Sequence, residues 1–238
     1  METFAGSIKG IQERMTFQLY DYPGGKIYLD LDEGEYAHRM LKGEYEPEFT
    51  NKMLAYLKPG MIFVDVGAHV GYYSLWAAKL VGETGMVLAF EPWAYLFDYM
   101  ANAALENGYK WLIFSGHAIG NENSNGAVFY RRDYTWGGSL HHELGGKEAF
   151  VVALRTLDYL WQDFQSWTPD VIKIDAEGAE LDVLRGAQDT IARCKHLLLL
   201  IAIHPEYGVT YDMLRELLEP QGFVLERQTN GNQVIATR

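Results

Sequence analysis

The sequence has a single cysteine, Cys194, among its 238 residues. One cysteine excludes a disulfide framework within the chain and fits a reducing compartment. Cys194 comes shortly before the apolar run LLLLIAI, so we expect a small buried hydrophobic side chain there and not a catalytic thiol.

Long hydrophobic segments are also missing. The longest apolar run covers residues 197–203 and is far too short to span a bilayer. The N-terminal stretch METFAGSIKGIQERMTF has no apolar core of signal-peptide length. Internal repeats, low-complexity tracts and long linkers are absent as well. These absences predict a soluble cytoplasmic protein that does not insert into a membrane.

Positive charge is scarce. The chain has 20 Lys and Arg residues against 32 Asp and Glu residues, a formal net charge of -12. Repulsion from phosphates disfavours general binding to nucleic acid or to anionic membranes, although a particular RNA or lipid substrate is not excluded. The hydrophobic fraction of 48% is ample for one well-packed α/β domain. The sequence gives little information on the oligomeric state, and a homo-oligomer is compatible with it.

Strand and helix patterns alternate along most of the chain. Hairpins are expected around PGG near the start and around Asn-Gly near the end. Helices are expected at 35–57, 72–80, 94–107, 179–194 and 211–222. Buried strands are expected at 61–66, 86–92, 111–120, 171–178 and 196–206, with two extra strands at 127–132 and 149–155.

This alternation predicts an α/β fold with a mostly parallel sheet and a C-terminal antiparallel hairpin. Residues 1–58 would form an N-terminal hairpin and helical segment, and residues 59–238 a Rossmann-like domain. Ligands of such sheets bind outside the carboxyl ends of the strands. The residues that directly follow each strand therefore carry the most functional weight.

The stretch FVDVGAHVGYYS, residues 63–74, places a carboxylate and two glycines at the end of the first buried strand. Gly67 lets the backbone turn tightly and approach a ligand, and Gly71 opens the next helix. Glu91 ends the second strand, where a carboxylate can accept both hydroxyls of a ribose. An ordinary strand-turn-helix with surface acids would also fit the first motif alone.

The glycine spacing separates two cofactor classes. A dinucleotide site needs G-x-G-x-x-G to seat a pyrophosphate. This chain has G-x-x-x-G preceded by Asp65, which would repel a pyrophosphate but suits a cationic aminoacyl sulfonium. Together with Glu91, the pattern favours S-adenosylmethionine over NAD.

Four motifs in this order resemble the FkbM-type S-adenosylmethionine-dependent methyltransferases: FVDVGAHVGYYS, AFEP, RTLDYL and IKIDAEGAELDVLRGA. The upstream GEYEPEFTNKML also resembles the helix before the cofactor strand in that family. The resemblance covers about residues 43–205, and KIDAEGAE is its most specific piece. It implies a Rossmann-like class I methyltransferase sheet and methylation of a hydroxyl group, often on a sugar or a natural-product scaffold.

The resemblance also implies site residues. The first motif would line the methionine part of the cofactor, Glu91 would take the ribose, and His117 and Ala118 would lie beside the adenine. Asp175 and Glu177 would face the reacting end. The cofactor-binding residues expected in this way are Asp65, Gly67, Ala68, His69, Gly71, Tyr73, Ser74, Glu91, Pro92, His117, Ala118 and Asp175.

One position departs from the family pattern. The fifth strand of the family usually ends in Ile-Glu-Ile-His, whereas this chain has Ala202 at the glutamate position and keeps His204. The two side chains would share a face of the strand. The role of the missing acid is lost in this chain or is performed elsewhere.

Methyl transfer needs a positioned hydroxyl and a proton acceptor. The candidates are Glu177, which we rank first, then Asp175 and His204. Glu177 could instead be a first-turn acid that interacts with a helix dipole, and His204 could be structural. The three side chains could also bind a divalent metal, which is possible but not expected because no dense ligand motif is present.

Several aromatic and polar residues could form the acceptor wall. Tyr134, Trp136, His141 and His142 lie in a glycine-flanked segment that could be a lid or a surface excursion. Tyr45, Glu46, Trp93 and Tyr95 are further wall candidates on weaker grounds.

Three functions are therefore left open. The first is an S-adenosylmethionine-dependent O-methyltransferase that acts on a small molecule or glycan. The second is a dinucleotide-dependent oxidoreductase of similar architecture, and the third is a cofactor-binding module without methyl transfer.

Overall fold

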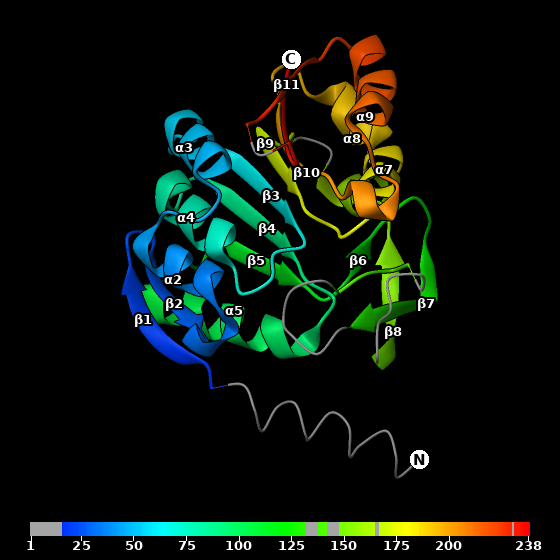
Figure 1. The fold of residues 1–238 in the computed structure, drawn as a ribbon. Helices are drawn as coiled ribbons and strands as arrows, with labels where there is room; N and C mark the ends of the chain where they lie inside the picture. Colours follow the sequence, from blue (N-terminus) through cyan, green and yellow to red (C-terminus); the bar gives the residue numbers. More distant parts are fainter. Residues whose placement is uncertain (1–15, 132–137, 142–147, 165–166, 230) are drawn as a thin grey trace.

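The computed structural model describes residues 16–131, 138–141, 148–164, 167–229 and 231–238. A seven-stranded sheet in the order β11-β12-β10-β9-β3-β4-β5 forms the centre of the molecule (Figure 1). Its strands are β3 (Ile62–Val66), β4 (Met86–Phe90), β5 (Leu112–Ser115), β9 (Val171–Ile174), β10 (Leu198–Ala202), β11 (Val224–Arg227) and β12 (Gln233–Thr237). None of the helices in the described residues is long and apolar enough to cross a membrane.

The central strands are buried on both faces, as expected of parallel strands covered by helices. Every residue of β4, β9 and β10 is buried. Strand β12 runs antiparallel to both of its neighbours, β10 and β11, while β3, β4, β5, β9 and β10 pair in parallel. The mostly parallel α/β sheet with a C-terminal antiparallel hairpin is thus confirmed.

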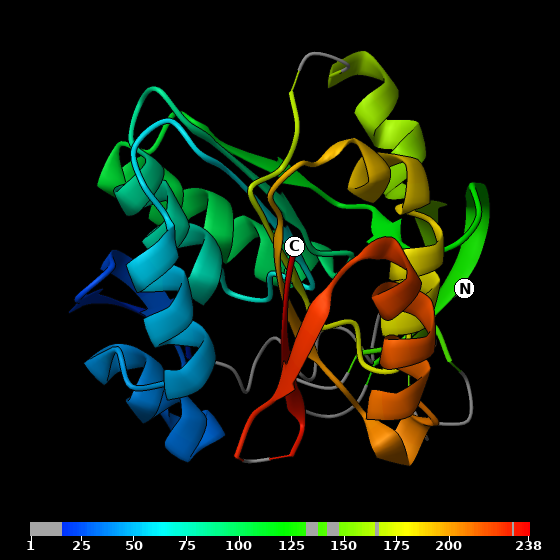
Figure 2. The ribbon, with the colours of Figure 1, turned by 90° about the horizontal axis from the view of Figure 1, so that it is seen from above.

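Two helical layers enclose the sheet (Figure 2). One layer holds α2 (Glu35–Lys42), α3 (Pro47–Tyr56), α4 (Tyr72–Val81) and α5 (Ala94–Asn107), with the hairpin of β1 (Gln18–Tyr22) and β2 (Gly25–Leu29) packed beside α5. The other holds α6 (Leu157–Leu160), α7 (Glu180–Arg185), α8 (Gln188–Arg193) and α9 (Tyr211–Leu218). Short 3-10 helices lie at Leu31–Glu33, Trp161–Phe164, Pro205–Tyr207 and Glu219–Gln221.

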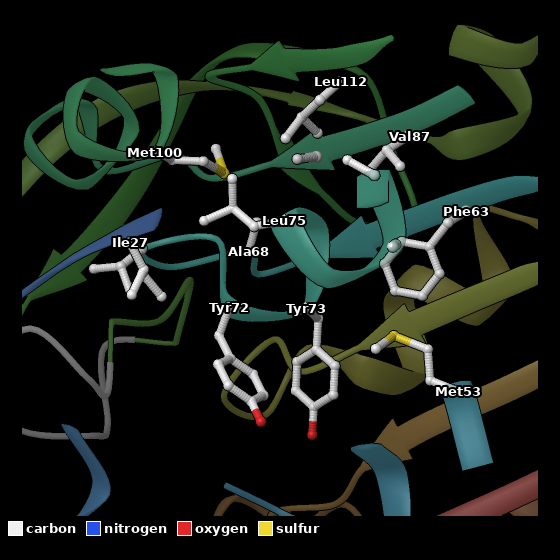
Figure 3. Packing of buried hydrophobic residues seen from close by; sticks show 14 of the residues in the cluster. Ile27, Met53, Phe63, Ala68, Tyr72, Tyr73, Leu75, Val87, Met100 and Leu112 are labelled. Carbon is white, nitrogen blue, oxygen red and sulfur yellow. The ribbon is translucent and has the colours of Figure 1, made fainter. Parts of the chain in front are cut away.

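The hairpin and the first helices share one hydrophobic core with the sheet (Figure 3). Ile27 of β2, Met53 of α3, Phe63 of β3, Leu75 of α4 and Met100 of α5 belong to the same buried cluster. Burial of such apolar side chains contributes about 25 cal/mol per Å² of area removed from water. The N-terminal segment is therefore held against the sheet by the hydrophobic effect, next to the turn that follows β3.

Two helices that the sequence predicted as continuous are each divided into two. The predicted helix 35–57 is divided into α2 and α3, because Gly43 ends α2 in the left-handed region with φ 73 and Pro47 opens α3. The predicted helix 179–194 is divided into α7 and α8 at Gly186. At Gly186 a Cβ atom would lie 2.0 Å from the carbonyl oxygen of Gly120, so the break lets two backbone segments touch.

The predicted strand 111–120 was also wrong as a single strand. Its first half is β5 of the central sheet, and its second half is β6 (Ala118–Ile119) of a separate three-stranded sheet. In that sheet β8 (Glu148–Arg155) pairs in parallel with β6 and antiparallel with β7 (Ser124–Arg131). The extra strands predicted around the glycine-flanked segment are thus confirmed, as is burial of the Cys194 side chain.

Candidate active site

A cavity of about 520 Å³ opens at the carboxyl ends of β3, β4, β9 and β10. The edge of the small sheet and the segment between α2 and α3 complete its wall. This is the place where open α/β sheets bind ligands. The cavity brings together most of the predicted site residues: Gly67, Ala68, His69, Tyr73, Glu91, Pro92, His117, Ala118, Asp175, Glu177 and His204.

Three predicted cofactor residues lie behind the cavity wall. Asp65 is fully buried and accepts a hydrogen bond of 2.6 Å from Ser74 Oγ. Burial raises the pKa of the Asp65 carboxyl, against the pull of Lys173 and Ser74. Gly71 begins α4 with φ 87, and a Cβ atom there would meet Met100 Cγ at 2.8 Å. In this structure Asp65 and Ser74 support the turn from within, and direct contact with a cofactor stays a prediction.

The turn after β3 depends on Gly67. Its φ is 77, and a Cβ atom at this position would lie 1.9 Å from the carbonyl oxygen of Asp175. The backbone amides of Gly67 and Ala68 both donate to the carbonyl oxygen of Phe90 at 3.0 Å. The loops after β3, β4 and β9 are therefore held in direct backbone contact, which fixes the floor of the cavity.

Glu91 is held at the end of β4 by two backbone amides. His69 N donates to Oε2 and Trp93 N donates to Oε1, each at 2.9 Å. Burial raises the pKa of the Glu91 carboxyl to about 7, although both backbone hydrogen bonds and Lys173 oppose the rise. Each carboxylate oxygen has a second lone pair. The ionised group can accept two more hydrogen bonds from a ligand in the cavity.

Lys173 places a buried cation in the middle of β9. Its Nζ lies 3.3 Å from Asp175 Oδ2 and 3.7 Å from Asp65 Oδ1, and it donates to the carbonyl oxygen of Gly67 at 3.1 Å. Burial opposes the charge, but Asp175 and Asp65 outweigh it and hold the Lys173 pKa above its usual range. Lys173 thus ties the turn after β3 to the end of β9.

His204 sits among three carboxylates. Its Nδ1 is hydrogen-bonded to Glu180 Oε1 at 2.8 Å, and its Nε2 lies 3.7 Å from both Asp175 Oδ1 and Glu177 Oε2. Burial lowers the pKa of the imidazole, but the Glu180 hydrogen bond and the carboxylates outweigh this effect and raise it to about 9. His204 is therefore an imidazolium at neutral pH, which can donate a proton but cannot accept one.

The same imidazolium acts on Asp175. Burial raises the pKa of Asp175, but Lys173 and His204 outweigh it and hold the pKa below its ordinary value. Asp175 is thus a carboxylate fixed between two cations. Such a group suits positioning a ligand better than removing a proton, because a depressed pKa makes it a weak base.

Glu177 stands at the rim of this cluster in a left-handed backbone conformation with φ 49. Ser139 Oγ donates to its carbonyl oxygen at 2.7 Å and links it to the segment after β7. Its side chain is 22% exposed. Of the carboxylates next to His204, Glu180 is fully buried, whereas Asp175 and Glu177 both line the cavity and are equally exposed. Asp175 differs from Glu177 in being paired with Lys173.

Asp175, Glu180 and His204 could hold a metal ion, since one ligand atom of each lies within 4.8 Å of the others. Glu180 Oε1, however, already accepts from the amides of Ala176 and Gly178, each at 3.1 Å, and from His204. An ion that used this oxygen would compete with these hydrogen bonds. A divalent metal was possible but not expected from the sequence, and its requirement is a matter for the chelator experiment described below.

Three of the residues that the sequence offered as wall candidates do line the cavity. Tyr45, Glu46 and Trp93 line the cavity and Tyr95 does not. His141 is exposed, while Tyr134, Trp136 and His142 lie outside the described residues. His117 bonds to Ser115 Oγ at 2.6 Å, and burial, with Arg155, lowers its pKa.

Sequence reasoning missed Lys173, Glu180 and Gln233. The signal for Lys173 was present, because a lysine in the otherwise apolar strand VIKI has no packing role and needs a charged partner. Glu180 looked like an ordinary first-turn acid. Gln233 was hidden in a terminal hairpin, and only the strand order brings it to the cavity.

Comparison with known proteins finds one family and several similar structures. The family model described as the Methyltransferase FkbM domain matches residues 65–225. A stretch of the AMB antimetabolite synthetase AmbE from Pseudomonas aeruginosa is 27% identical over 248 residues, which is 85% of this chain but 11% of the synthetase.

Two crystal structures share the fold. The methyltransferase FkbM from Methylobacillus flagellatus KT has a TM-score of 0.53 and 16% identity, over 98% of this chain and 58% of that chain. TYW2 from P. horikoshii, in complex with MeSAdo, has a TM-score of 0.51 and 14% identity, over 93% of this chain and 70% of that chain. At such identities the likeness concerns the fold alone.

Proposed function

We propose, because the chain belongs to the methyltransferase FkbM family, that it moves a methyl group from S-adenosylmethionine to a hydroxyl group of a small molecule or sugar-containing acceptor. The observation that carries the proposal is the pairing of Glu91 with the Gly67 turn over one cavity. A carboxylate at the end of the second parallel strand, next to a tight glycine turn, fits a ribose and an aminoacyl chain.

The residues present fit the cofactor. Glu91 would accept the ribose hydroxyls, and His117 and Ala118 would border the adenine. The backbone of the Gly67 turn, which lines the cavity, would border the methionine part. S-adenosylmethionine supplies an activated methyl group on a sulfonium, so the protein needs only to orient the acceptor and to manage its proton.

Glu177 is our candidate for the proton acceptor. It lies just past β9, its side chain lines the cavity, and its Oε2 is 3.7 Å from Nε2 of His204. We assign His204 to orient this carboxylate, held itself by Glu180, and Asp175 to position the reacting end. The charge on His204 argues against using it as the base.

The acceptor belongs to small-molecule biosynthesis in this proposal. Similarity to a stretch of a protein named an antimetabolite synthetase supports that class, and so does the negative charge of the chain, which disfavours nucleic acid in general. A dinucleotide-dependent oxidoreductase is the weaker candidate, because the turn lacks the third glycine that a pyrophosphate site needs.

The test is methyl transfer from labelled S-adenosylmethionine to a small-molecule extract of the source cells. We expect a labelled product with wild type, and a rate reduced roughly a hundredfold or more in Glu177→Gln, the usual worth of a positioned proton acceptor. The matched control is Glu206→Gln, an exposed acid outside the cavity, which should keep the wild-type rate.

Full activity of Glu177→Gln would remove this residue from the mechanism. If wild type binds the cofactor yet labels nothing in the extract, the chain is a cofactor-binding module without methyl transfer under these conditions, and the enzyme proposal fails. Inhibition by a chelator, reversed by magnesium or manganese, would instead make the carboxylates metal ligands.

A further inference from the structure

The side chain of Gln233 is buried in the cavity wall without a visible task. It is 1% exposed and lines the cavity. Its Nε2 and Oε1 make no hydrogen bond of ordinary length among the described residues, and the side chain that its amide approaches is the Glu46 carboxyl. A buried amide without partners costs free energy, so native proteins seldom keep one without a function. Because Gln233 lines the cavity, a ligand there would supply the partners once the amide turns toward it.

The strand register explains how Gln233 reaches the cavity. In the antiparallel pair of β10 and β12, Gln233 lies directly opposite Ala202. Side chains in such a pair share a face and stand about 4.5–5.5 Å apart at Cβ. The small side chain of Ala202 leaves the space above it to the longer glutamine. The polar group that the family places on β10 is thus replaced by an uncharged amide from the neighbouring strand.

Three carboxylates accompany the amide. Glu46, directly before α3, accepts a hydrogen bond of 2.7 Å from Tyr73 OH. Burial raises the pKa of the Glu46 carboxyl, and a long hydrogen bond from the Gln233 amide opposes the rise. Asp175 and Glu177 line the same cavity. Lys173 is engaged by Asp65 and Asp175, and His204 by Glu180, so neither offers a free cation to a new anion.

We propose that Gln233 binds the methyl acceptor through an uncharged group that donates and accepts hydrogen bonds side by side, and that this end of the cavity rejects acceptors with a carboxylate there. The inference rests on the proposed function. The glutamine amide presents a carbonyl oxygen and an N–H on one edge. A primary amide or a pair of neighbouring hydroxyls complements that edge.

The position of β12 assigns Gln233 to the acceptor and not to the cofactor. Glu91, which we assign to the ribose, directly follows β4, which is four strand positions from β12 in the sheet order. At a strand spacing of about 4.8 Å this corresponds to roughly 19 Å. Asp175 and Glu177 follow β9, which lies between the two. A ligand that reaches Gln233 therefore lies beyond the reacting end of the cofactor.

The first test asks whether Gln233 serves the fold or a ligand. Gln233→Met keeps the length of the side chain and removes the amide. It should raise Tm of the ligand-free protein by about 2–4 °C, the range for a modest gain in a chain of this size. Thr190→Val is the matched control, because Thr190 Oγ1 is also buried without a partner among the described residues but does not line the cavity. A lower Tm for Gln233→Met would mean that the amide is structural, and it would overturn the proposal.

The second test measures acceptor recognition directly. Protein loaded with S-adenosylhomocysteine is probed by saturation-transfer NMR with N-acetylserinamide, methyl glucoside and N-acetylserine. We expect the amide or the glucoside to bind and N-acetylserine, which differs from N-acetylserinamide by its carboxylate, to bind at least tenfold more weakly. The two neutral probes distinguish an amide from a hydroxyl pair.

Gln233→Met should weaken binding of the neutral probe at least tenfold and keep the affinity for S-adenosylhomocysteine within twofold. Thr190→Val should bind every ligand as wild type does. Equal binding of N-acetylserine, unchanged probe binding in Gln233→Met, or no binding of either neutral probe would overturn the proposal. If wild type fails to bind S-adenosylhomocysteine, the proposed function fails instead, and the Tm comparison still decides whether Gln233 is structural.

Discussion

Glu91 is buried and accepts two backbone hydrogen bonds. Together these set the pH above which its carboxylate would accept hydrogen bonds from a ribose. Burial raises its pKa to about 7, so near neutral pH the empty site is a mixture of acid and carboxylate. Only the carboxylate has lone pairs free for two hydroxyl donors on both oxygens. If Glu91 takes the ribose as we propose, cofactor affinity is coupled to the ionisation of this one group.

We expect affinity for S-adenosylhomocysteine to rise with pH through about 7, by up to about tenfold between pH 6 and pH 8. Glu91→Gln, which cannot ionise, should bind about 1.5–3 kcal/mol more weakly at pH 8, the range for hydrogen bonds to a charged group, and should lose this pH dependence. Glu83→Gln, an exposed acid shortly before the same strand, is the control. Calorimetry at the two pH values measures both effects, and a flat wild-type profile would contradict the assignment.

His204 makes a second, separate prediction about pH. Its folded pKa of about 9 lies above the unfolded value of about 6.5, so its contribution to stability is fully present below pH 6.5 and is lost as pH rises through 9. We expect the free energy of unfolding, measured by denaturant titration, to fall between pH 6.5 and pH 9.5. His204→Gln should show a smaller fall over the same range. Identical slopes for the two proteins would mean that the imidazolium is not stabilised by Glu180 and its neighbours.

At the scale of elements, the loops after β3 and β9 meet through bare backbone. Gly67→Ala would place a Cβ atom 1.9 Å from the carbonyl oxygen of Asp175, in addition to the strain of φ 77. The φ strain alone costs about 1–3 kcal/mol. Gly82→Ala is the matched control, because Gly82 has φ 62 and open space around its Cβ position.

We expect Gly67→Ala to lower the free energy of unfolding by clearly more than Gly82→Ala does and to abolish binding of S-adenosylhomocysteine. Gly82→Ala should cost only the conformational strain and keep binding. Denaturant titration and calorimetry on the two variants separate the backbone contact from the strain. Equal losses in the free energy of unfolding of the two variants would show that the two loops can move apart around the added Cβ atom at little cost.

The sequence predicted most elements because periodicity and burial agree in them. Buried strands such as β9 and β10 are continuous apolar runs, and α5 spans the predicted residues. The prediction failed where a single residue interrupts a pattern, as Gly43 does between α2 and α3. It also failed where two consecutive strands belong to different sheets, as β5 and β6 do. Such changes depend on contacts between distant segments, which periodicity does not contain.

The candidate site was predicted to a similar extent. Residues that directly follow a strand, such as Glu91 and Glu177, were found from position alone. Lys173 lies inside a strand and Gln233 inside a hairpin, so their roles appear only when the sheet order brings β12, β10 and β9 together. The pKa of His204 likewise depends on Glu180, whose approach no local pattern indicates.

At the scale of the whole molecule, two hydrophobic cores hold the sheet from opposite faces and leave the carboxyl ends of its strands open. The N-terminal hairpin and α2–α3 extend one core so that Tyr45 and Glu46 close one wall of the cavity, and the antiparallel strand β12 brings Gln233 to another. In the proposed function, the end of the cavity near β3 and β4 would take the cofactor and the end near β12 would take the acceptor.

The central claim is that the cofactor end takes S-adenosylmethionine. Isothermal titration calorimetry of the wild-type protein at pH 8 with S-adenosylhomocysteine and, separately, with NAD tests it most directly. The account predicts saturable binding of S-adenosylhomocysteine, accompanied by a rise in Tm because a ligand of the native state shifts unfolding by mass action, and no comparable effect of NAD. Tight binding of NAD without binding of S-adenosylhomocysteine would contradict it.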